Sequence, residues 1–319
     1  MKCLITGGAG FIGSHLSERL LESGYEIVNL DSFNDYYDPN IKRRNIAGLL
    51  PRAGYTLVEG DILDRAGLQL LFQQHRFEAI VHLAARAGVR PSIAQPLLYE
   101  QVNCEGTVNL LELARHHRVD KFIFGSSSSV YGENSKVPFS EEDRVDHPIS
   151  PYAATKKAGE LTCYTYHHLY KMKITCLRFF TVYGPRQRPD MAIHKFTKMI
   201  ANGEKVPMYG DGTSRRDFTF ISDIVDGIEK ALHACSAYHL YNLGESRTID
   251  LRSLIQLIQE CVGKKAMIEQ LPVQPGDVPI TYADIAKARR EIGYDPKVDI
   301  AEGVQRFVEW FKLNHAQSR

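Results

Sequence analysis

A glycine-rich turn stands almost at the start of the chain, and it constrains the fold more than any other feature. An aliphatic run at residues 2–6 leads into Gly7-Gly8-Ala9-Gly10-Phe11-Ile12-Gly13, and a helical pattern follows over residues 11–23. Glycine permits a tight strand-to-helix turn, and the N–H groups at a helix start have no partners within the helix, so they attract a phosphate. We therefore predict a phosphate-binding turn between the first strand and the first helix.

The alternation of strand and helix continues along the first half of the chain. Short aliphatic runs predict strands at residues 2–6, 26–30, 56–58, 79–83, 121–124 and 174–177. Longer helical patterns predict helices at residues 11–23, 65–75, 99–117 and 151–170. Such alternation is typical of the α/β class, and the spacings fit right-handed crossovers. The predicted fold is a Rossmann-type doubly wound parallel sheet.

The pattern changes after about residue 179, where prolines and glycines divide the chain into shorter elements. Helices are predicted at residues 221–234, 251–262, 284–292 and 300–313, with a short strand at residues 240–243. We predict two domains, residues 1–179 and residues 180–319, of which the second is smaller and mixed α/β. Their boundary should not be clean, because residues 216–244 and the last helix are expected to pack back on the first domain.

The composition argues against several classes of function. The 319 residues carry a net charge of +1, so no general attraction to nucleic acid or to a membrane surface is expected. The six cysteines form no Cys-x-x-Cys pair, and no apolar stretch reaches transmembrane length. We expect buried thiols in a reducing compartment, and the lead before the first strand is too short for a signal peptide. A cytoplasmic protein is predicted.

The glycine spacing also points to a class of ligand. Gly8-x-Gly10-x-x-Gly13 is the dinucleotide-binding pattern, and Asp31 ends the second predicted strand 18 residues later. A carboxylate at this place accepts hydrogen bonds from the adenosine ribose and repels a 2′-phosphate, so the pattern favours NAD over NADP. The alternative is that a nearby cation folds back to accommodate the phosphate, and the candidates are Lys42, Arg43 and Arg44.

Tyr152-Ala-Ala-Thr-Lys156 lies in a predicted helix that follows a serine run, Ser126–Ser129. Residues four apart share a helix face, so the Lys156 ammonium is expected near the Tyr152 phenol. Lowering a phenol pKa of about 10 by about three units takes roughly 4 kcal/mol, which an ammonium and a bound cationic nicotinamide could supply. Tyr152 would then be a base near neutral pH. Roughly one such pair is expected by chance in a chain with 16 tyrosines, so the companion motifs decide its weight.

In this order, the motifs resemble those of the extended short-chain dehydrogenase/reductases, and their nucleotide-sugar branch in particular. The matching features are the glycine turn, Asp31, Asp61-Ile62, His82–Ala85, Asn103, Ser126–Gly132 and the pair of Tyr152 and Lys156. Residues 178–185, 216–223 and 274–277 are similar to the substrate-domain signatures of that branch. The resemblance covers nearly the whole chain. It implies tightly held NAD, a UDP-sugar substrate and a homodimer formed through the helices at 99–117 and 151–170, whose apolar stripes could equally be intramolecular core.

Within this branch, the chain is most similar to the UDP-glucuronate 4-epimerases. The similar stretches are residues 34–38, 87–90, 126–132 and 181–191. UDP-glucose 4-epimerases generally carry Asn in place of Thr181 and Arg in place of Gln274, and the 4,6-dehydratases carry Asp-Glu in place of Ser128-Ser129. The resemblance implies an isomerase that interconverts UDP-glucuronate and UDP-galacturonate through a transient 4-keto sugar. The alternatives are a UDP-glucuronate decarboxylase forming UDP-xylose, a UDP-glucose 4-epimerase and a catalytically silent NAD-binding regulator.

The resemblance also implies roles for single residues. Catalysis is expected from Ser127, Tyr152 and Lys156. Cofactor binding is expected from Tyr152 and Lys156 together with Gly7, Gly10, Phe11, Ile12, Gly13, Asp31, Asp61, Ile62, Leu83, Ala84, Ala85, Asn103 and Phe179. Substrate binding is expected from Arg90, Ser127, Ser128, Ser129, Tyr152, Thr181, Arg188, Arg216 and Asp277. Asp61 could instead cap a helix, and the serine and threonine hydroxyls could bond to nearby backbone.

No metal site is predicted. The pairs His116-His117 and His167-His168 each place neighbouring rings on different faces of a helix, and no acidic or cysteine partners have ligand spacing.

Overall fold

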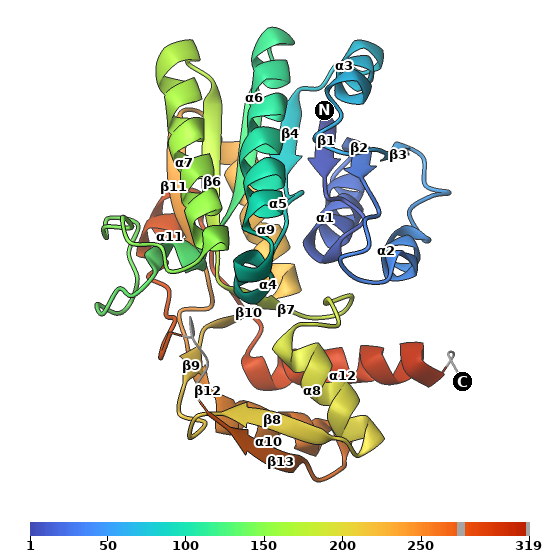
Figure 1. The fold of residues 1–319 in the computed structure, drawn as a ribbon. Helices are drawn as coiled ribbons and strands as arrows, with labels where there is room; N and C mark the ends of the chain where they lie inside the picture. Colours follow the sequence, from blue (N-terminus) through green and yellow to red (C-terminus); the bar gives the residue numbers. More distant parts are fainter. Residues whose placement is uncertain (273–277, 317–319) are drawn as a thin grey trace.

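The first part of the protein is a parallel sheet of seven strands covered by helices on both faces (Figure 1). We analysed a computed structural model, which describes residues 1–272 and 278–316. The strand order is β11-β6-β5-β4-β1-β2-β3. The strands are β1 (Lys2–Thr6), β2 (Glu26–Asp31), β3 (Tyr55–Glu59), β4 (Ala79–His82), β5 (Lys121–Ser127), β6 (Lys173–Phe179) and β11 (Tyr238–Leu243). This arrangement confirms the predicted α/β class and doubly wound sheet.

Alternate residues of each strand place their side chains in two separate hydrophobic cores, one on each face of the sheet. On β1, Cys3 and Ile5 belong to one buried cluster and Leu4 to the other. The helices α1 (Phe11–Glu22) and α9 (Ile221–Ala234) pack together on the first face. The opposite face carries α3 (Arg65–Gln74), α6 (Gly106–His116) and α7 (Pro151–Tyr170), as Figure 1 shows.

Several short helices differ from the sequence-based expectation. The helix predicted at residues 99–117 is divided into α5 (Pro96–Glu100), a π-helical turn at Gln101–Glu105 and α6. Two further helices, α2 (Pro39–Ile46) and α4 (Val89–Ala94), were not predicted. Both are too short to show a clear helical period in the sequence.

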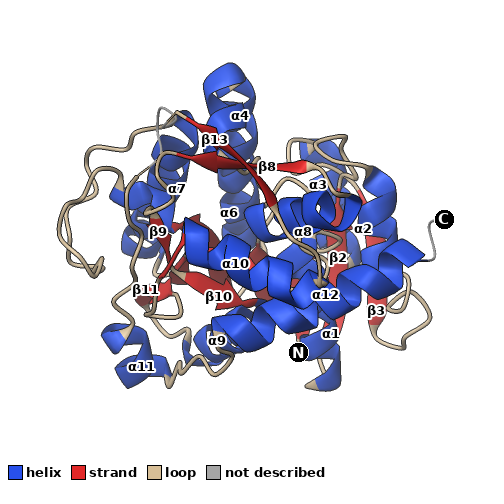
Figure 2. Cartoon of the chain, turned by 90° about the horizontal axis from the view of Figure 1, so that it is seen from below, coloured by secondary structure: helices blue, strands red, loops and turns tan. Residues whose placement is uncertain are grey.

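The second part of the protein combines three two-stranded sheets with four helices within the described residues (Figure 2). The sheets pair β7 (Thr181–Tyr183) with β10 (Phe218–Phe220), β9 (Arg215–Arg216) with β12 (Ile249–Asp250), and β8 (Lys205–Tyr209) with β13 (Met267–Leu271). The helices are α8 (Ala192–Asn202), α10 (Leu251–Val262), α11 (Ala286–Ile292) and α12 (Ile300–Ala316). Helix α11 begins at Ala286, two residues later than predicted, and the Asp284 carboxylate accepts a hydrogen bond from the Ala286 N–H.

The chain passes between the two parts more than once, and residues 216–244 form one such segment. This segment supplies β11, which pairs with β6, and α9, which packs on α1. Helix α12 packs against α8, α10 and β10 of the second part, and its expected packing on the first part stays a prediction. Its apolar face brings Phe307 against the His194 ring of α8, with the centroids 5.6 Å apart. The domain boundary between residues 179 and 180 stays a prediction.

Two further expectations concern the cysteines and the membrane. Four cysteines are buried, whereas Cys104 and Cys261 are partly exposed, and all six are free thiols. Within the described residues, no helix combines the length and apolar character that crossing a membrane requires.

Candidate active site

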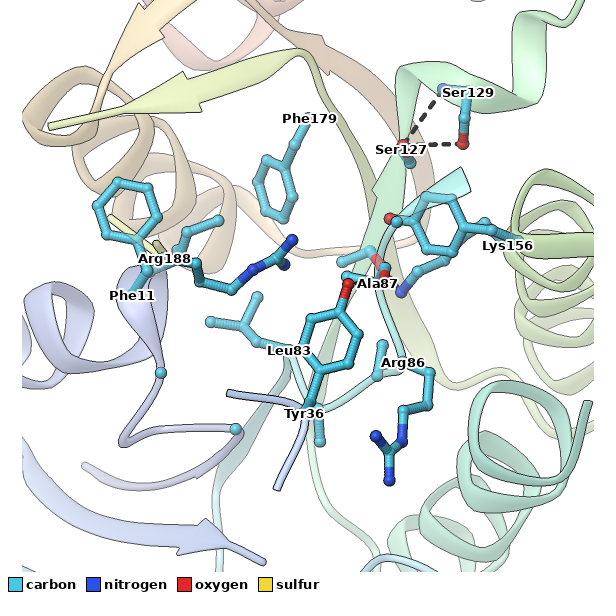
Figure 3. A pocket seen from close by; sticks show the side chains of 18 of the residues that line it. Phe11, Tyr36, Leu83, Arg86, Ala87, Ser127, Ser129, Lys156, Phe179 and Arg188 are labelled. Carbon is cyan, nitrogen blue, oxygen red and sulfur yellow. Dashed lines mark hydrogen bonds between the residues drawn. The ribbon is translucent and has the colours of Figure 1, made fainter. Parts of the chain in front are cut away.

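A cavity of about 570 Å³ lies at the carboxyl ends of the sheet strands. From β1 the chain continues to β2 and β3 on one side and then crosses over to β4 on the other side of β1, so the sheet has its switch point here, where ligands bind in such folds. One side of the cavity is formed by the glycine turn and Asp31, and the other by the ends of β5 and β6 and by Arg216 and Thr281 from the second part. Figure 3 shows labelled side chains from both sides converging on this space.

The glycine turn leaves no room for side chains. Gly7 has a φ of +69°, and a Cβ atom there would lie 2.8 Å from the Ala84 nitrogen. A Cβ atom on Gly13 would lie 2.4 Å from the Gly7 carbonyl oxygen. The turn brings the start of α1 to the cavity, where the N–H groups of Phe11, Ile12 and Gly13 lack helical partners. These residues therefore fit the pyrophosphate of a dinucleotide.

Asp31 lies buried at the end of β2 and faces the cavity. Its carboxylate accepts hydrogen bonds from the backbone N–H groups of Ala9 at 3.1 Å and Phe33 at 2.9 Å. The Lys42 ammonium of α2 forms an ion pair with it at 2.8 Å, and both side chains are at least nine-tenths buried. Lys42 thus does fold back toward this site, but in the structure it is held by Asp31, whereas Arg43 pairs with Glu59.

Two buried polar side chains shape the loop that follows β4. His82 hydrogen-bonds to Thr6 at 2.8 Å and to Thr107 at 3.0 Å, and Thr6 in turn accepts a bond from the Ala84 N–H. Asn103 accepts a hydrogen bond from the Arg86 N–H and donates one to the Arg86 carbonyl oxygen. Asn103 supports this loop and does not line the cavity, so its expected direct contact with the cofactor stays a prediction.

Tyr152 is placed at the first turn of α7 by an N-terminal cap. The Ser150 hydroxyl accepts a hydrogen bond from the Ala153 N–H, and Pro151 takes the first helical position. Burial raises the pKa of the Tyr152 phenol, while a hydrogen bond with Ser127 and the charge of Arg188 act in the opposite direction. The expected lowering of this pKa is therefore not produced by the protein's own groups, because burial outweighs them.

The Lys156 side chain reaches from α7 to the end of β5. Its ammonium donates a hydrogen bond to the Gly125 carbonyl oxygen at 2.7 Å and lies 5.1 Å from the centre of the Phe124 ring. Burial lowers the pKa of Lys156 to about 8. Lys156 therefore links α7 to the end of β5, and its charge faces the cavity from beneath the serine run.

The serines form a compact turn at the end of β5. The Ser127 hydroxyl accepts hydrogen bonds from the Ser129 N–H at 3.2 Å and the Ser129 hydroxyl at 2.9 Å (Figure 3). Ser128 and Ser129 begin a short 3₁₀ helix and line the cavity beside Ser127. The Ser129 hydroxyl is thus bonded to another side chain of the turn and not to backbone, and its expected contact with the substrate stays a prediction.

Arg188 extends into the middle of the cavity, between Phe179 and Tyr36 in Figure 3. Its guanidinium lies 5.3 Å from the centre of the Tyr36 ring and forms two hydrogen bonds with the Asp190 carboxylate, at 3.0 and 2.8 Å. The Tyr36 hydroxyl donates a hydrogen bond to the Ala87 carbonyl oxygen. This arrangement presents a delocalised positive charge to an anionic ligand.

The structure brings most of the predicted site residues to one cavity. Among the cofactor residues only Asn103 is absent from its walls, and Asp61 lines it while its carboxylate also caps the turn at Leu63. Among the substrate residues Arg90 does not line it and stacks on the Tyr209 ring, whereas Asp277 lies outside the described residues. Several cavity residues in loops were not predicted from the sequence, namely Tyr36, Tyr37, Arg86, Met191 and Thr281.

Among the described residues, no cluster of His, Cys, Asp and Glu could hold a metal ion. The polar groups that line the cavity include phenols, ammonium groups, hydroxyls, carboxylates and guanidinium groups.

Comparison with known proteins places this cavity in a family. The family model described as GDP-mannose 4,6 dehydratase matches residues 4–307 of the chain. The protein belongs to this family. The match includes both parts of the fold and all described cavity residues, which agrees with the predicted membership of the extended short-chain dehydrogenase/reductases.

Several proteins with assigned activities are similar to this chain over almost its full length. A UDP-glucuronate 4-epimerase of Thermodesulfobacterium geofontis is 42% identical over 98% of this chain and 96% of its own. The crystal structure of UDP-glucuronic acid 4-epimerase from Bacillus cereus, in complex with UDP-glucuronic acid and NAD, has a TM-score of 0.93 and 38% identity, covering 98% of this chain and 100% of that one. A UDP-glucose 4-epimerase from Thermotoga maritima with UDP-glucose has a TM-score of 0.91 and 34% identity, covering 99% and 100%.

Proposed function

We propose that the protein is an NAD-dependent 4-epimerase that interconverts UDP-glucuronate and UDP-galacturonate. The observation that carries this proposal is the meeting of Tyr152, Ser127 and Lys156 with the glycine turn and Asp31 around one cavity. The full-length similarity to UDP-glucuronate 4-epimerases supports the same substrate and cofactor. The prediction made from the sequence agrees with these relatives.

The glycine turn and the start of α1 would hold the pyrophosphate of NAD, and Asp31 would accept hydrogen bonds from the adenosine ribose. When bound, NAD would take the hydride from C4 of the sugar and return it to the other face of the ring. The Asp31 carboxylate already accepts three hydrogen bonds from protein groups, which fix its position beside the cavity. A fixed carboxylate discriminates ribose hydroxyls from a 2′-phosphate.

We assign the proton transfer to Tyr152. Its phenol oxygen would take the proton of the 4-hydroxyl and later give it back, while Ser127, which shares a hydrogen bond with that phenol, would hold the same sugar oxygen. The buried Lys156 ammonium would hold the nicotinamide ribose from its place on Gly125. Because burial alone raises the pKa of Tyr152, the base form depends on positive charge that arrives with the ligand.

The uronic acid makes the position of the carboxylate decisive. A sugar with a 4-ketone and a carboxylate on C5 is a β-keto acid, which loses carbon dioxide when the bond to the carboxylate aligns with the ketone π system. An epimerase must therefore hold this carboxylate close to the plane of the carbonyl. Ser128 and Thr181 offer hydroxyls on the cavity wall for that contact, and Arg188 and Arg216 offer charge for the anionic groups of the UDP-sugar.

The experiment is to incubate the purified protein with UDP-glucuronate and to follow the products by NMR. UDP-galacturonate is the expected product, whereas UDP-xylose would identify a decarboxylase. If UDP-glucuronate is not converted at all, the remaining hypothesis is a catalytically silent NAD-binding regulator. UDP-glucose is tested in parallel, because the Thermotoga maritima relative is named for that substrate. Tyr152→Phe should lower kcat at least about 100-fold, since general acid–base catalysis typically contributes that much. Unchanged turnover in this variant would mean that another group is the base.

We also propose a homodimer in the cytoplasm. Helix α7 exposes Leu161, Tyr164 and Leu169, and the neighbouring α5 exposes Leu97, so an apolar surface is available for a second copy. The six free thiols support a reducing compartment. Sedimentation should give twice the chain mass for the wild type, and Leu161→Lys should shift the protein toward the monomer.

A further inference from the structure

Asp217 is a fully buried carboxylate in the second part of the protein, directly after Arg216. One of its oxygens, Oδ1, accepts a hydrogen bond from the Glu245 N–H at 2.7 Å. The other, Oδ2, accepts bonds from the N–H groups of Ser246 at 3.1 Å and Ala283 at 3.0 Å. A single side chain thus binds the loop after β11 and the segment before α11.

The backbone of Asp217 makes two more links of the same kind. Its carbonyl oxygen accepts a hydrogen bond from the Thr181 N–H at 3.1 Å, and its own N–H donates to the Thr281 hydroxyl at 3.4 Å. Thr181, Arg216 and Thr281 all line the cavity and come from three segments far apart in the sequence. Asp217 itself is not among the lining residues, yet it contacts or adjoins all three.

The surroundings of Asp217 are packed too closely for these segments to shift independently. A Cβ atom on Gly244 would lie 2.4 Å from the Ala283 Cβ and 3.2 Å from Asp217 Oδ2. Burial raises the pKa of Asp217 to about 6, although the N–H groups that bond to its carboxylate act in the opposite direction. Ionising this carboxyl group in the folded protein therefore costs free energy. A buried acceptor that binds several N–H groups cannot be replaced by a group that also donates without leaving donors unpaired.

We propose that Asp217 is a positioning residue that fixes Thr181, Arg216 and Thr281 for binding of the UDP-sugar. The proposal rests on the proposed function, because the ligand of this wall is taken to be the UDP moiety and its sugar. Asp217 acts through its neighbours and not on the reacting atoms. Loss of its acceptor should therefore weaken substrate binding and leave the chemistry of Tyr152 and the hold on NAD intact.

Asp223 provides a matched control on the same stretch of chain. Its carboxylate is also buried, and it accepts a hydrogen bond from the Val298 N–H at 3.0 Å. Burial raises its pKa as well. However, Asp223 ties α9 to the segment before α12, and neither Asp223 nor Val298 lines the cavity. Asp217→Asn and Asp223→Asn thus both neutralise a buried carboxylate, and only the first acts on the cavity wall.

The wild type and both variants are compared in four measurements. Calorimetry gives the Kd of UDP, and kinetics with UDP-glucuronate give KM and kcat. The NAD content and the unfolding midpoint of each protein are measured as well. Asp217→Asn should raise the Kd and KM at least about tenfold, keep kcat within about threefold and keep its NAD, since a lost buried acceptor costs about 1–3 kcal/mol. Asp223→Asn should keep the Kd within about twofold while its unfolding midpoint falls.

Several outcomes would overturn the proposal. Equal effects of the two variants on the Kd, or a joint loss of kcat and NAD in Asp217→Asn, would show a purely structural role. If Asp217→Asn does not fold, Asp217→Ser keeps one acceptor in a smaller side chain and is compared in the same way. If neither folds while Asp223→Asn does, Asp217 serves folding alone.

A wild type that binds UDP but does not convert UDP-glucuronate contradicts the proposed function, and the Kd comparison still decides the role of Asp217. A wild type that does not bind UDP overturns both.

Discussion

The Lys156 ammonium is bonded to the Gly125 carbonyl oxygen at 2.7 Å, two residues before Ser127 on the same strand. Helix α7 carries Tyr152 and Lys156 on one face, so this bond fixes the helix against the strand that ends in the serine turn. This hydrogen bond explains how the Tyr-x-x-x-Lys motif comes to lie beside Ser127, which stands more than twenty residues earlier in the sequence. Lys156 is also buried, and this burial lowers the pKa of its ammonium group.

Activity should fall as the pH rises above 8. Burial lowers the pKa of Lys156 from 10.5 to about 8, so its ammonium is charged below that pH and loses its proton above it. Neutral Lys156 no longer holds the ribose as a cation, and kcat/KM should decrease about tenfold per pH unit on the alkaline limb. A pH profile between 6 and 10 measures this. Lys156→Arg keeps its charge throughout, so the same alkaline limb in that variant would assign the titration to another group.

Cofactor preference should depend on the pair of Asp31 and Lys42. In Asp31→Asn the repulsion of a 2′-phosphate is gone and the Lys42 ammonium is released from its ion pair, so NADP should bind better relative to NAD. The affinities of both nucleotides are measured by calorimetry on protein freed of cofactor, and a shift of the NADP to NAD ratio of about tenfold or more is expected. The double variant Asp31→Asn/Lys42→Met is the control. If it binds NADP as well as the single variant does, Lys42 is not the group that receives the phosphate.

The local parts of this site could be predicted from the sequence because short-range chemistry defines them. The glycine turn and Asp31 lie on consecutive elements, and Tyr152 and Lys156 share one helix. Tertiary contacts could not be predicted in the same way. Asn103 has the right position in the chain, yet its amide bonds to the Arg86 backbone.

The missed cavity residues have a similar explanation. Tyr36 and Thr281 come from loops without a periodic pattern, and tertiary contacts, among them those with Ala87 and Asp217, place them at the cavity. The shift in the pKa of Tyr152 could not be predicted from the sequence either, because the direction of this shift depends on how deeply the phenol is buried. Pattern spacing places residues on one face of an element, but it does not give their burial.

Stability should depend strongly on the buried ion pair of Arg178 and Glu160, which connects β6 to α7. The guanidinium donates two hydrogen bonds to the carboxylate, at 2.8 and 2.9 Å, and the Ser126 hydroxyl donates a third at 2.7 Å. Arg178→Met leaves the carboxylate buried without this partner and should lower the free energy of unfolding by about 3–5 kcal/mol in urea denaturation. The double variant Arg178→Met/Glu160→Leu removes the buried charge and should recover much of the loss. A double variant as unstable as the single one would show that packing of the guanidinium, and not the charge, is responsible.

Stability should also fall in mild acid because of His82. Burial, with a smaller contribution from the charge of Lys156, lowers the pKa of His82 from 6.5 to about 3, and both ring nitrogens are bonded to threonine hydroxyls. The unfolded chain takes up a proton near pH 6.5 and the folded chain does not, so the stabilisation is complete above pH 6.5 and is lost progressively toward pH 3.

Between pH 7.5 and pH 5.0 this single residue should cost about 2 kcal/mol of unfolding free energy, which is the proton-binding free energy of an unfolded imidazole over that range. Urea denaturation at the two pH values measures the loss. His82→Asn removes the titrating ring, so its stability should depend less on pH by about the same amount, although the variant starts from a lower stability at pH 7.5. If the variant and the wild type lose equal stability between the two pH values, the folded protein must admit a charged His82, and the bonds to Thr6 and Thr107 do not hold the ring neutral.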